Sequence, residues 1–215
     1  MDNVYDRIGE GWYNYRHHTI FKTELERLAA RWQGGRLLNV GCAHGPDFIP
    51  FREGFELHGV DISARMLELA ARYAEKFDFK VELQQADARD LPYDDGSFNW
   101  AIAVATYHHI EDAAGRLKAF RELHRVLKPG GEALVTCWNR WQRRFWFKPR
   151  DLVVPWRSRG ETFERRYHLF TFGELRRLAE DAGFTVPELF PEDRYRFPLR
   201  TFARNACAVV RKEGT

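Results

Sequence analysis

Residues 38–45 read Leu-Asn-Val-Gly-Cys-Ala-His-Gly, an apolar stretch that ends in a turn of small residues. Leu37 to Val40 is typical of a buried strand, and the residues from Gly41 to Gly45 are small enough for a tight strand-to-helix turn that a ligand can approach closely. Such a turn is weak evidence by itself, since glycine at a helix start often serves packing alone. Its meaning depends on the residues that follow.

An acidic residue follows each of the next two expected strands. Asp61 lies 20 residues after Gly41, at the end of the strand 55–60, where its carboxylate can accept both hydroxyl hydrogens of a ribose. Asp87 follows the short alternating strand 81–84, where it can contact an adenine edge. Either aspartate alone is more often an ordinary strand-end or turn residue. The three loops together predict a nucleoside-containing ligand, because one ligand explains all of them.

The remaining hydrophobic pattern alternates helices and strands. Apolar residues recur at helical spacing within 4–32, and nearly continuous apolar runs further on indicate strands buried on both faces. The later expected elements are a helix from Ser63 to Tyr73, a strand over 100–105, a helix over 117–127 stopped by Pro129-Gly130-Gly131, a strand over 133–138, a helix over 172–182, and strands over 184–189 and 206–210. This order predicts an α/β doubly wound sheet that binds ligands beyond the carboxyl ends of its strands.

At these motifs the chain resembles the class I S-adenosylmethionine-dependent methyltransferases, from about Arg36 to Val135. The matching motifs are LNVGCAHG (38–45), GVDIS (59–63), ADA (86–88) and LKPGG (127–131). Asn39 stands where the family usually has an acidic residue and Ala43 where it has its middle glycine, so we expect altered affinity rather than lost binding.

The resemblance implies a Rossmann-like, seven-stranded, mostly parallel sheet with S-adenosyl-L-methionine as its cofactor and Met66 as an apolar neighbour of the adenine. The implied cofactor-binding residues are Asn39, Gly41, Cys42, Ala43, Gly45, Asp61, Ile62, Met66, Asp87, Ala88 and Ala105. A dinucleotide-binding dehydrogenase shares the spacing of turn and acidic residue. It is excluded because it needs G-x-G-x-x-G and a second nucleotide-binding half, which this sequence lacks.

Length and composition fit one soluble domain of 215 residues, 44% hydrophobic and 30% charged. We expect an N-terminal helical cap (1–35), a cofactor-binding core (36–138), a basic aromatic insertion that binds substrate (139–170), and a closing helix and strands (171–215). No leader or membrane-spanning stretch is evident, so a cytoplasmic location is expected. The three cysteines are too scattered for a zinc site or a disulfide framework.

Two loops after the fourth and fifth expected strands should face the methyl acceptor. In Thr106-Tyr107-His108-His109, a histidine either binds substrate or acts as a base, or merely hydrogen-bonds loop backbone. Trp138 either stacks on a base or packs in the core. Residues 140–166 hold nine basic and three acidic residues, an excess of six positive charges, interleaved with six aromatic ones. This composition suits an unpaired RNA loop, unless the aromatic residues pack onto the domain. An inserted loop segment is expected after the fifth strand, with 148–160 as the likeliest long insertion.

A narrower resemblance, to the tRNA wobble-uridine methyltransferases that esterify 5-carboxymethyluridine, spans almost the full chain. It is carried by Val4-Tyr5-Asp6, Arg16, Ile102, His108-His109, the Trp138 segment, Val154-Pro155-Trp156, Arg166-Tyr167-His168-Leu169-Phe170 and Arg204-Asn205. The candidates for holding the uridine carboxylate or nearby phosphates, or for catalysis, are Arg16, His108, His109, Arg166 and His168. The candidate substrate-binding residues are Trp138, Asn139, Arg140 and Tyr167. No metal site is expected.

Two partners follow from this resemblance: the anticodon loop of tRNA, and a small zinc-binding activator subunit that pairs with an exposed edge strand. The alternating strand 81–84 is the expected edge, unless its own loops shield it. Two other functions stay open. One is methylation of a small metabolite such as a quinone precursor or fatty acid, with the aromatic insertion as a lid. The other is a non-catalytic RNA-binding module, suggested by Asn39 and Ala43.

Overall fold

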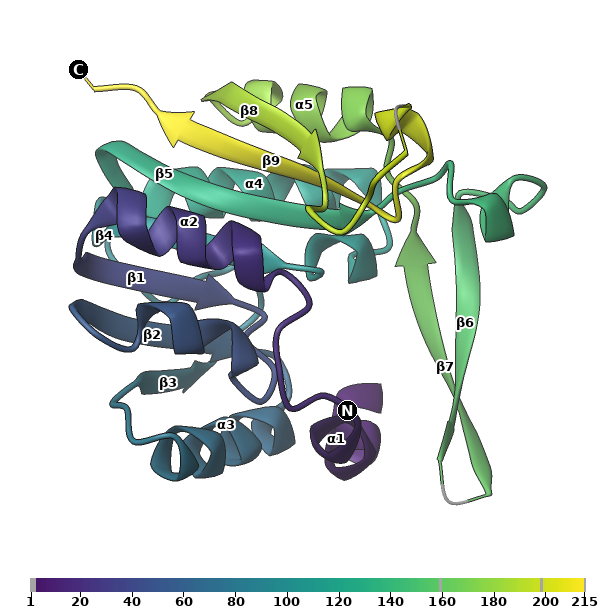
Figure 1. Cartoon of the computed structure of the whole chain (residues 1–215), viewed down its shortest axis with the longest axis horizontal. Coiled ribbons are helices and arrows are strands. Elements are labelled where there is room, and N and C mark those ends of the chain that lie inside the picture. Colours follow the sequence, from purple (N-terminus) through teal and green to yellow (C-terminus); the bar gives the residue numbers. More distant parts are fainter. Residues whose placement is uncertain (1–2, 159, 198, 215) are drawn as a thin grey trace.

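Seven strands form one sheet in the computed structural model, which describes residues 3–158, 160–197 and 199–214. The strands are β1 (Gly35–Val40), β2 (Phe55–Asp61), β3 (Glu82–Gln85), β4 (Phe98–Val104), β5 (Leu127–Trp138), β8 (Phe184–Pro191) and β9 (Asn205–Lys212). They lie in the order β3-β2-β1-β4-β5-β9-β8, and β9 runs antiparallel to both of its neighbours while the other pairings are parallel (Figure 1). The predicted fold class is confirmed.

The strand order reverses between β1 and β4. On one side of this point β1 leads to β2 and β3, and on the other side β4 leads to β5; β1 pairs in parallel with both β2 and β4. Loops that leave the carboxyl ends of β1 and β4 turn toward opposite faces of the sheet, which opens a crevice between them. In Figure 1 this end of the sheet faces α1 and the strands β6 and β7.

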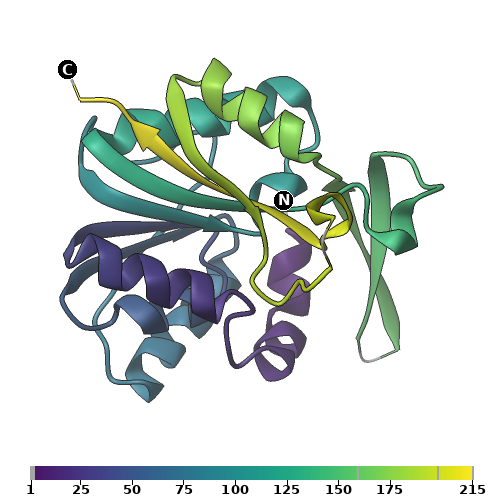
Figure 2. The same cartoon turned by 45° about the horizontal axis from the view of Figure 1, so that its top comes forward.

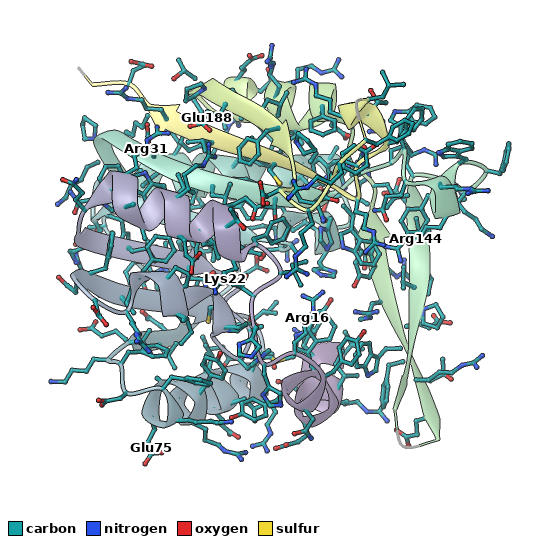
Figure 3. The ribbon with its side chains drawn as sticks, in the orientation of Figure 1. Arg16, Lys22, Arg31, Glu75, Arg144 and Glu188 are labelled. Atoms are coloured by element: carbon teal, nitrogen blue, oxygen red, sulfur yellow. The ribbon has the colours of Figure 1, made fainter. Side chains whose placement is uncertain are left out.

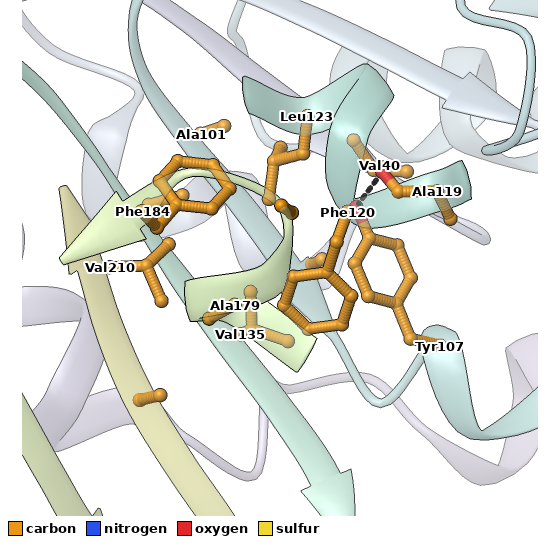
Figure 4. Packing of buried hydrophobic residues seen from close by; sticks show 14 of the residues in the cluster. Val40, Ala101, Tyr107, Ala119, Phe120, Leu123, Val135, Ala179, Phe184 and Val210 are labelled. Atoms are coloured by element: carbon orange, nitrogen blue, oxygen red, sulfur yellow. Dashed lines mark hydrogen bonds between the residues drawn. The ribbon is translucent and has the colours of Figure 1, made fainter. Parts of the chain in front are cut away.

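Helices cover both faces of the sheet (Figures 1 and 2). The covering elements are α2 (Lys22–Trp32) and the 3₁₀ helix η1 (Pro46–Phe51) on one face, and α4 (Ala113–Val126) and α5 (Phe172–Asp181) on the other. Leu37 of β1 packs in the cluster of α2, whereas its neighbour Leu38 packs in the cluster that contains Phe120 of α4 (Figure 4). Consecutive strand residues point to opposite faces, so both faces of β1 are buried.

The N-terminal helix α1 (Val4–Tyr15) packs against α3 (Ala64–Lys76), beside the carboxyl ends of the strands (Figure 1). The side chain of Asp6 in α1 accepts hydrogen bonds from the hydroxyl of Ser63 at 2.6 Å and from the backbone N–H of Arg65 at 3.2 Å. The same hydroxyl oxygen of Ser63 accepts from the N–H of Met66 at 3.1 Å and caps α3. One serine therefore starts α3 and anchors α1 above the crevice.

The insertion expected after β5 is present, but it contains a β-hairpin where a loop was predicted. β6 (Asp151–Ser158) and β7 (Glu161–His168) pair in antiparallel register and stand apart from the main sheet (Figure 1). β7 buries Phe163, Arg165 and Tyr167 and exposes the residues between them. This alternation is the signal of a strand, but the arginine at an inward position obscures it.

Three other boundaries differ from the expected ones. Pro129-Gly130-Gly131 does not separate helix from strand, because β5 begins at Leu127 and includes it. α4 begins at Ala113, since the carboxylate of Asp112 caps the helix by accepting from the N–H of Gly115 at 2.6 Å. β3 covers 82–85 and is an edge strand, as predicted. No helix in the described ranges is long and apolar enough to cross a bilayer.

The core on the α4 side should respond strongly to truncation. Phe120 is completely buried, so Phe120→Ala is expected to lower the free energy of unfolding by about 3–5 kcal/mol through lost burial and a residual cavity. Phe147→Ala is the control, because that side chain is 97% exposed and its loss should cost under about 0.5 kcal/mol. Urea unfolding followed by fluorescence measures both. Equal losses in the two variants contradict this assignment of the core.

Candidate functional site

A cavity of about 580 Å³ lies at the carboxyl ends of β1 to β4, between the sheet, α1 and β7. We call it the main cavity. Nine of the predicted cofactor residues line it: Gly41, Cys42, Ala43, Asp61, Ile62, Met66, Asp87, Ala88 and Ala105. Asn39 and Gly45 do not. Asn39 lies inside β1, fully buried, with both amide atoms unpartnered among the described residues, and Gly45 precedes η1.

The turn after β1 is fixed by backbone hydrogen bonds. The N–H groups of Gly41 and Cys42 donate to the carbonyl of Val60 at 2.8 and 3.0 Å, and the hydroxyl of Thr106 donates to the carbonyl of Val40 at 2.9 Å. Gly41 has a φ of 71°, and a Cβ there would lie 2.4 Å from the side chain of Thr106. Only glycine fits that position, because both the backbone conformation and the space exclude a side chain.

Ala43 occupies the left-handed region with a φ of 48°, which glycine adopts without strain. Its N–H donates to Oδ2 of Asp61 at 2.8 Å, and the N–H of Ser63 donates to Oδ1 at 2.9 Å. Each carboxylate oxygen keeps a lone pair for a further donor. Burial raises the pKa of Asp61 to about 6, so the group is charged at neutral pH.

Asp87 lies at the other end of this wall and is paired with a residue that the sequence analysis did not single out. Arg89 donates to the Asp87 carboxylate through Nε at 2.9 Å and Nη2 at 2.6 Å, and through its backbone N–H at 2.8 Å. These bonds lower the pKa of Asp87. Both residues line the main cavity. Arg89 therefore holds the turn after β3, and contact of Asp87 with an adenine stays a prediction.

The lining matches the chemistry of S-adenosylmethionine. Asp61 offers acceptors to a ribose diol, and Ile62 and Met66 offer apolar surface to a purine face. The same cavity is lined by Asp47, whose carboxylate suits the amino group of an amino acid. Burial raises the pKa of Asp47 to about 6. The residues present therefore fit this cofactor.

His109 and Tyr5 lie at the end of the main cavity nearest the hairpin. The hydroxyl oxygen of Tyr5 is 2.9 Å from Nδ1 of His109, within hydrogen-bonding distance. Burial lowers the pKa of His109 to about 3, and burial also raises the pKa of Tyr5 well above its ordinary value. Near neutral pH both groups are uncharged, and His109 is a weak base.

Several predicted acceptor residues lie outside the main cavity. His108 is buried; its Nδ1 accepts from the N–H of Trp138 at 3.2 Å, and its ring stacks on Tyr167, which in turn stacks on Trp138. The buried side-chain amide of Asn139 donates to two backbone carbonyls, and Arg140 donates to the carbonyl of Phe145. Their roles as substrate-binding residues stay predictions; in this structure they support neighbouring backbone and aromatic packing.

Arg166 lines both the main cavity and a second cavity, whereas His168 lines only the second one. Arg166 is exposed on the rim of the main cavity and forms an ion pair with Glu111 at 3.4 Å. The second cavity has a volume of about 430 Å³, and His108 and Tyr167 line it as well. The ring nitrogens of His168 lie 2.7 Å from Asp151 and 2.8 Å from Glu174. Both ring nitrogens of His168 are therefore engaged by carboxylates, and the side chain links β6 to α5.

The structure adds lining residues that the sequence analysis did not assign to the site. The most prominent are Tyr5, Trp12, Asp47 and Arg165. Arg165 could have been found from the alternating burial pattern of β7. Arg16, which was predicted, lies between α1 and the strand ends (Figure 3), so the structure brings it together with the residues of the predicted cofactor site.

The Asp61 carboxylate makes a testable contribution to cofactor binding. Asp61→Asn is expected to weaken S-adenosylmethionine binding about 10- to 100-fold through loss of a charged acceptor. In the wild type the affinity should fall as the pH drops through about 6, because protonation removes the charge there. Calorimetry across this range measures both effects. The pH dependence should be weaker in Asp61→Asn, and the part that remains belongs to Asp47, whose pKa is also about 6. Affinity that does not change with pH in the wild type contradicts the assignment.

A family model described as "Methyltransferase domain" matches residues 37–131. The chain is 25% identical to the tRNA (carboxymethyluridine(34)-5-O)-methyltransferase of Schizosaccharomyces pombe, over 87% of this chain and 90% of that protein. It is 27% identical to phosphoethanolamine N-methyltransferase 3 of Arabidopsis thaliana, over 97% of this chain and 40% of that protein. It is 28% identical to probable tRNA methyltransferase 9B of Bos taurus, over 57% of this chain and 26% of that protein.

The chain thus spans less than half the length of the plant and bovine relatives. Among solved structures, an S-adenosylmethionine-dependent methyltransferase from Clostridium acetobutylicum matches with a TM-score of 0.77 at 14% identity, over 99% of this chain and 100% of that one. A chain from the complex between the Haloferax volcanii Trm112 methyltransferase activator and a methyltransferase matches with a TM-score of 0.71 at 18% identity, over 99% of both chains. The chain therefore carries a methyltransferase domain on the fold of the S-adenosylmethionine-dependent methyltransferases, and S-adenosylmethionine is the cofactor that this domain and fold imply.

Proposed function

We propose that this chain transfers the methyl group of S-adenosylmethionine to the carboxylate of 5-carboxymethyluridine at the wobble position of tRNA. The observation that carries the proposal is the lining of the main cavity, which combines the cationic Arg16 with an uncharged, weakly basic His109. A carboxylate is already ionised at neutral pH and needs no base, whereas a phenol or ammonium must first lose a proton. The site thus favours an anionic acceptor.

The residues of the chain act mainly by orientation. When bound, S-adenosylmethionine supplies an electrophilic methyl group. Asp61 and the turn at Gly41 fix the nucleoside end, and Arg16 attracts the acceptor carboxylate. The hydrogen-bonded pair of Tyr5 and His109 forms an uncharged part of the cavity wall, beside which the reacting oxygen would lie. Holding the nucleophile in line with the methyl group and away from water accounts for the rate enhancement, and esterification removes the charge that Arg16 attracts.

The segment 140–150 supplies a surface suited to RNA. It contains five basic residues and no acidic one. Trp141, Trp146 and Phe147 are exposed there, and the guanidinium of Arg144 lies 4.5 Å from the ring centroids of Trp138 and Phe145 (Figure 3). Cationic groups attract phosphates, and exposed aromatic rings stack on unpaired bases. We therefore assign the anticodon loop to this surface.

A small-molecule acceptor is the second candidate, because the phosphoethanolamine N-methyltransferase matches 97% of this chain. The main cavity would also suit a small anionic metabolite. The two candidate functions differ in salt dependence: tRNA binding through phosphates weakens steeply as salt rises, whereas binding of a small metabolite does not. The methyltransferase domain at 37–131 favours an enzyme over the non-catalytic RNA-binding module.

The direct test is methylation of an anticodon stem-loop that carries 5-carboxymethyluridine, followed by mass spectrometry of its nucleosides. Arg16→Ala is expected to lower kcat/KM for this RNA about 10- to 100-fold, through loss of a charged hydrogen bond, and to spare cofactor affinity. Arg52→Ala, on the exposed C-cap of η1, is the control. Unchanged kinetics removes Arg16 from the acceptor site. A loss of cofactor affinity instead assigns it to the methionine end.

We further propose that β3 receives an activator subunit by edge pairing. β3 lies at the edge of the sheet, and three of its four residues are exposed. A fold match found in a complex with Trm112 supports this partner class. Addition of a Trm112-type protein is expected to slow hydrogen exchange of the amides of residues 82–85, with β8 at the opposite edge as the internal control. Slower amide exchange in β8 in place of β3, or unchanged exchange in both strands, contradicts the proposal.

A further inference from the structure

Arg165 is a buried cation without a counterion. Its side chain projects from β7 into the wall of the main cavity, and the residue is 6% exposed. It forms no ion pair with any residue in the described part of the chain, and its Nε atom is buried without a hydrogen-bond partner. Exposed arginines around it do have partners: Arg7 pairs with Glu161, and Arg166 pairs with Glu111.

Three aromatic rings hold this guanidinium in place. Its carbon lies 5.5 Å from the ring centroid of Trp12, 5.1 Å from Trp156 and 5.3 Å from Tyr167. Cation–π contacts of this kind recover part of the lost hydration, but they satisfy none of the five N–H donors. Burial of an unpaired charge is costly, and proteins normally place an opposite charge beside it. The missing partner is therefore an anion that enters the main cavity.

The position of Arg165 places that anion at the acceptor end. Tyr167, which Arg165 contacts, packs edge-on against His109 at 4.5 Å between ring centroids, and His109 is joined to Tyr5. Both Tyr5 and His109 line the main cavity with Arg165, whereas Asp61 and Asp87 line its nucleoside end. Tyr5, His109 and Tyr167 are uncharged at neutral pH. The acidic residues of the lining include Asp61, Glu111 and Glu164, and none of them forms an ion pair with Arg165 in the described part of the chain. A negative group from the substrate would supply that ion pair.

We propose that Arg165 is a specificity-determining residue that binds the carboxylate of the methyl acceptor, and this inference rests on the proposed function. The planar guanidinium presents parallel N–H donors that match the two oxygens of a carboxylate. Acceptors that lack a negative group leave the buried charge unpaired and are rejected. The methyl ester product lacks the charge as well, so it binds more weakly than the substrate and leaves.

The test compares Arg165→Met with Arg7→Met, an exposed arginine that reaches the same hairpin but already has a carboxylate partner. Calorimetry measures binding of 5-carboxymethyluridine and of uridine, each with S-adenosylhomocysteine present. The wild type and Arg7→Met should prefer the carboxylated nucleoside about 10-fold or more, and Arg165→Met should lose this preference. Arg165→Lys, which keeps the charge without the planar fork, should restore it in part.

A second readout separates binding from folding. The melting temperature of Arg165→Met without ligand should equal or exceed that of the wild type, because the variant removes an unpaired buried charge. A fall in melting temperature together with retained preference for the carboxylate shows a structural role and overturns the proposal. So does a loss of S-adenosylhomocysteine affinity with unchanged acceptor preference, because the anion would then be the carboxylate of the cofactor.

A third arm distinguishes this inference from the proposed function. The melting temperature is followed while acetate is added at constant ionic strength. If 5-carboxymethyluridine does not bind the wild type but acetate stabilises the wild type and not Arg165→Met, the anion site stands and the proposed acceptor is wrong. If 5-carboxymethyluridine binds the wild type and Arg165→Met equally, the proposed acceptor stands and the role of Arg165 is wrong. If neither anion acts through Arg165, the inference is wrong.

Discussion

The turn after β1 is the constraint on which the site depends. Its first residues donate to the carbonyl of Val60, Thr106 fixes it from the side of β4, and the N–H of Ala43 reaches the carboxylate of Asp61. Three loops from three strands are thereby set at defined positions at the strand-order reversal. Because the turn is small and closely bonded, it leaves a cavity beyond the sheet, and α1, anchored through Ser63, covers that cavity.

In the proposed function, the distribution of charge in the main cavity selects the acceptor. Its nucleoside end carries the aspartates, one bonded to backbone N–H groups and one paired with Arg89. Its acceptor end carries arginines and uncharged ring side chains. Low dielectric strengthens each of these interactions, so an anion is attracted to one end and repelled from the other. A neutral product has no such attraction.

The sequence predicted the sheet well, and nine of the eleven predicted cofactor residues line the main cavity. Both results rest on local patterns: apolar strands, small turn residues, and aspartates at strand ends. The sequence predicted the acceptor end less well. His108 and His168 are conspicuous in the sequence but are engaged in packing and in carboxylate contacts. Arg165 was not singled out, since an arginine at an inward strand position contradicts the usual hydrophobic pattern. The contacts of Arg165 with the main cavity depend on how the hairpin packs against α1, and local sequence patterns do not encode that packing.

One measurement tests the central claim most directly: transfer of a labelled methyl group from S-adenosylmethionine to two anticodon stem-loops that differ only in carrying 5-carboxymethyluridine or uridine. Our account predicts label on the carboxylated RNA alone, and release of that label by mild alkali, because a methyl ester hydrolyses there. Alkali-resistant label, or equal label on both RNAs, would show methylation of a base, ribose or other atom. Either result would contradict carboxylate methylation.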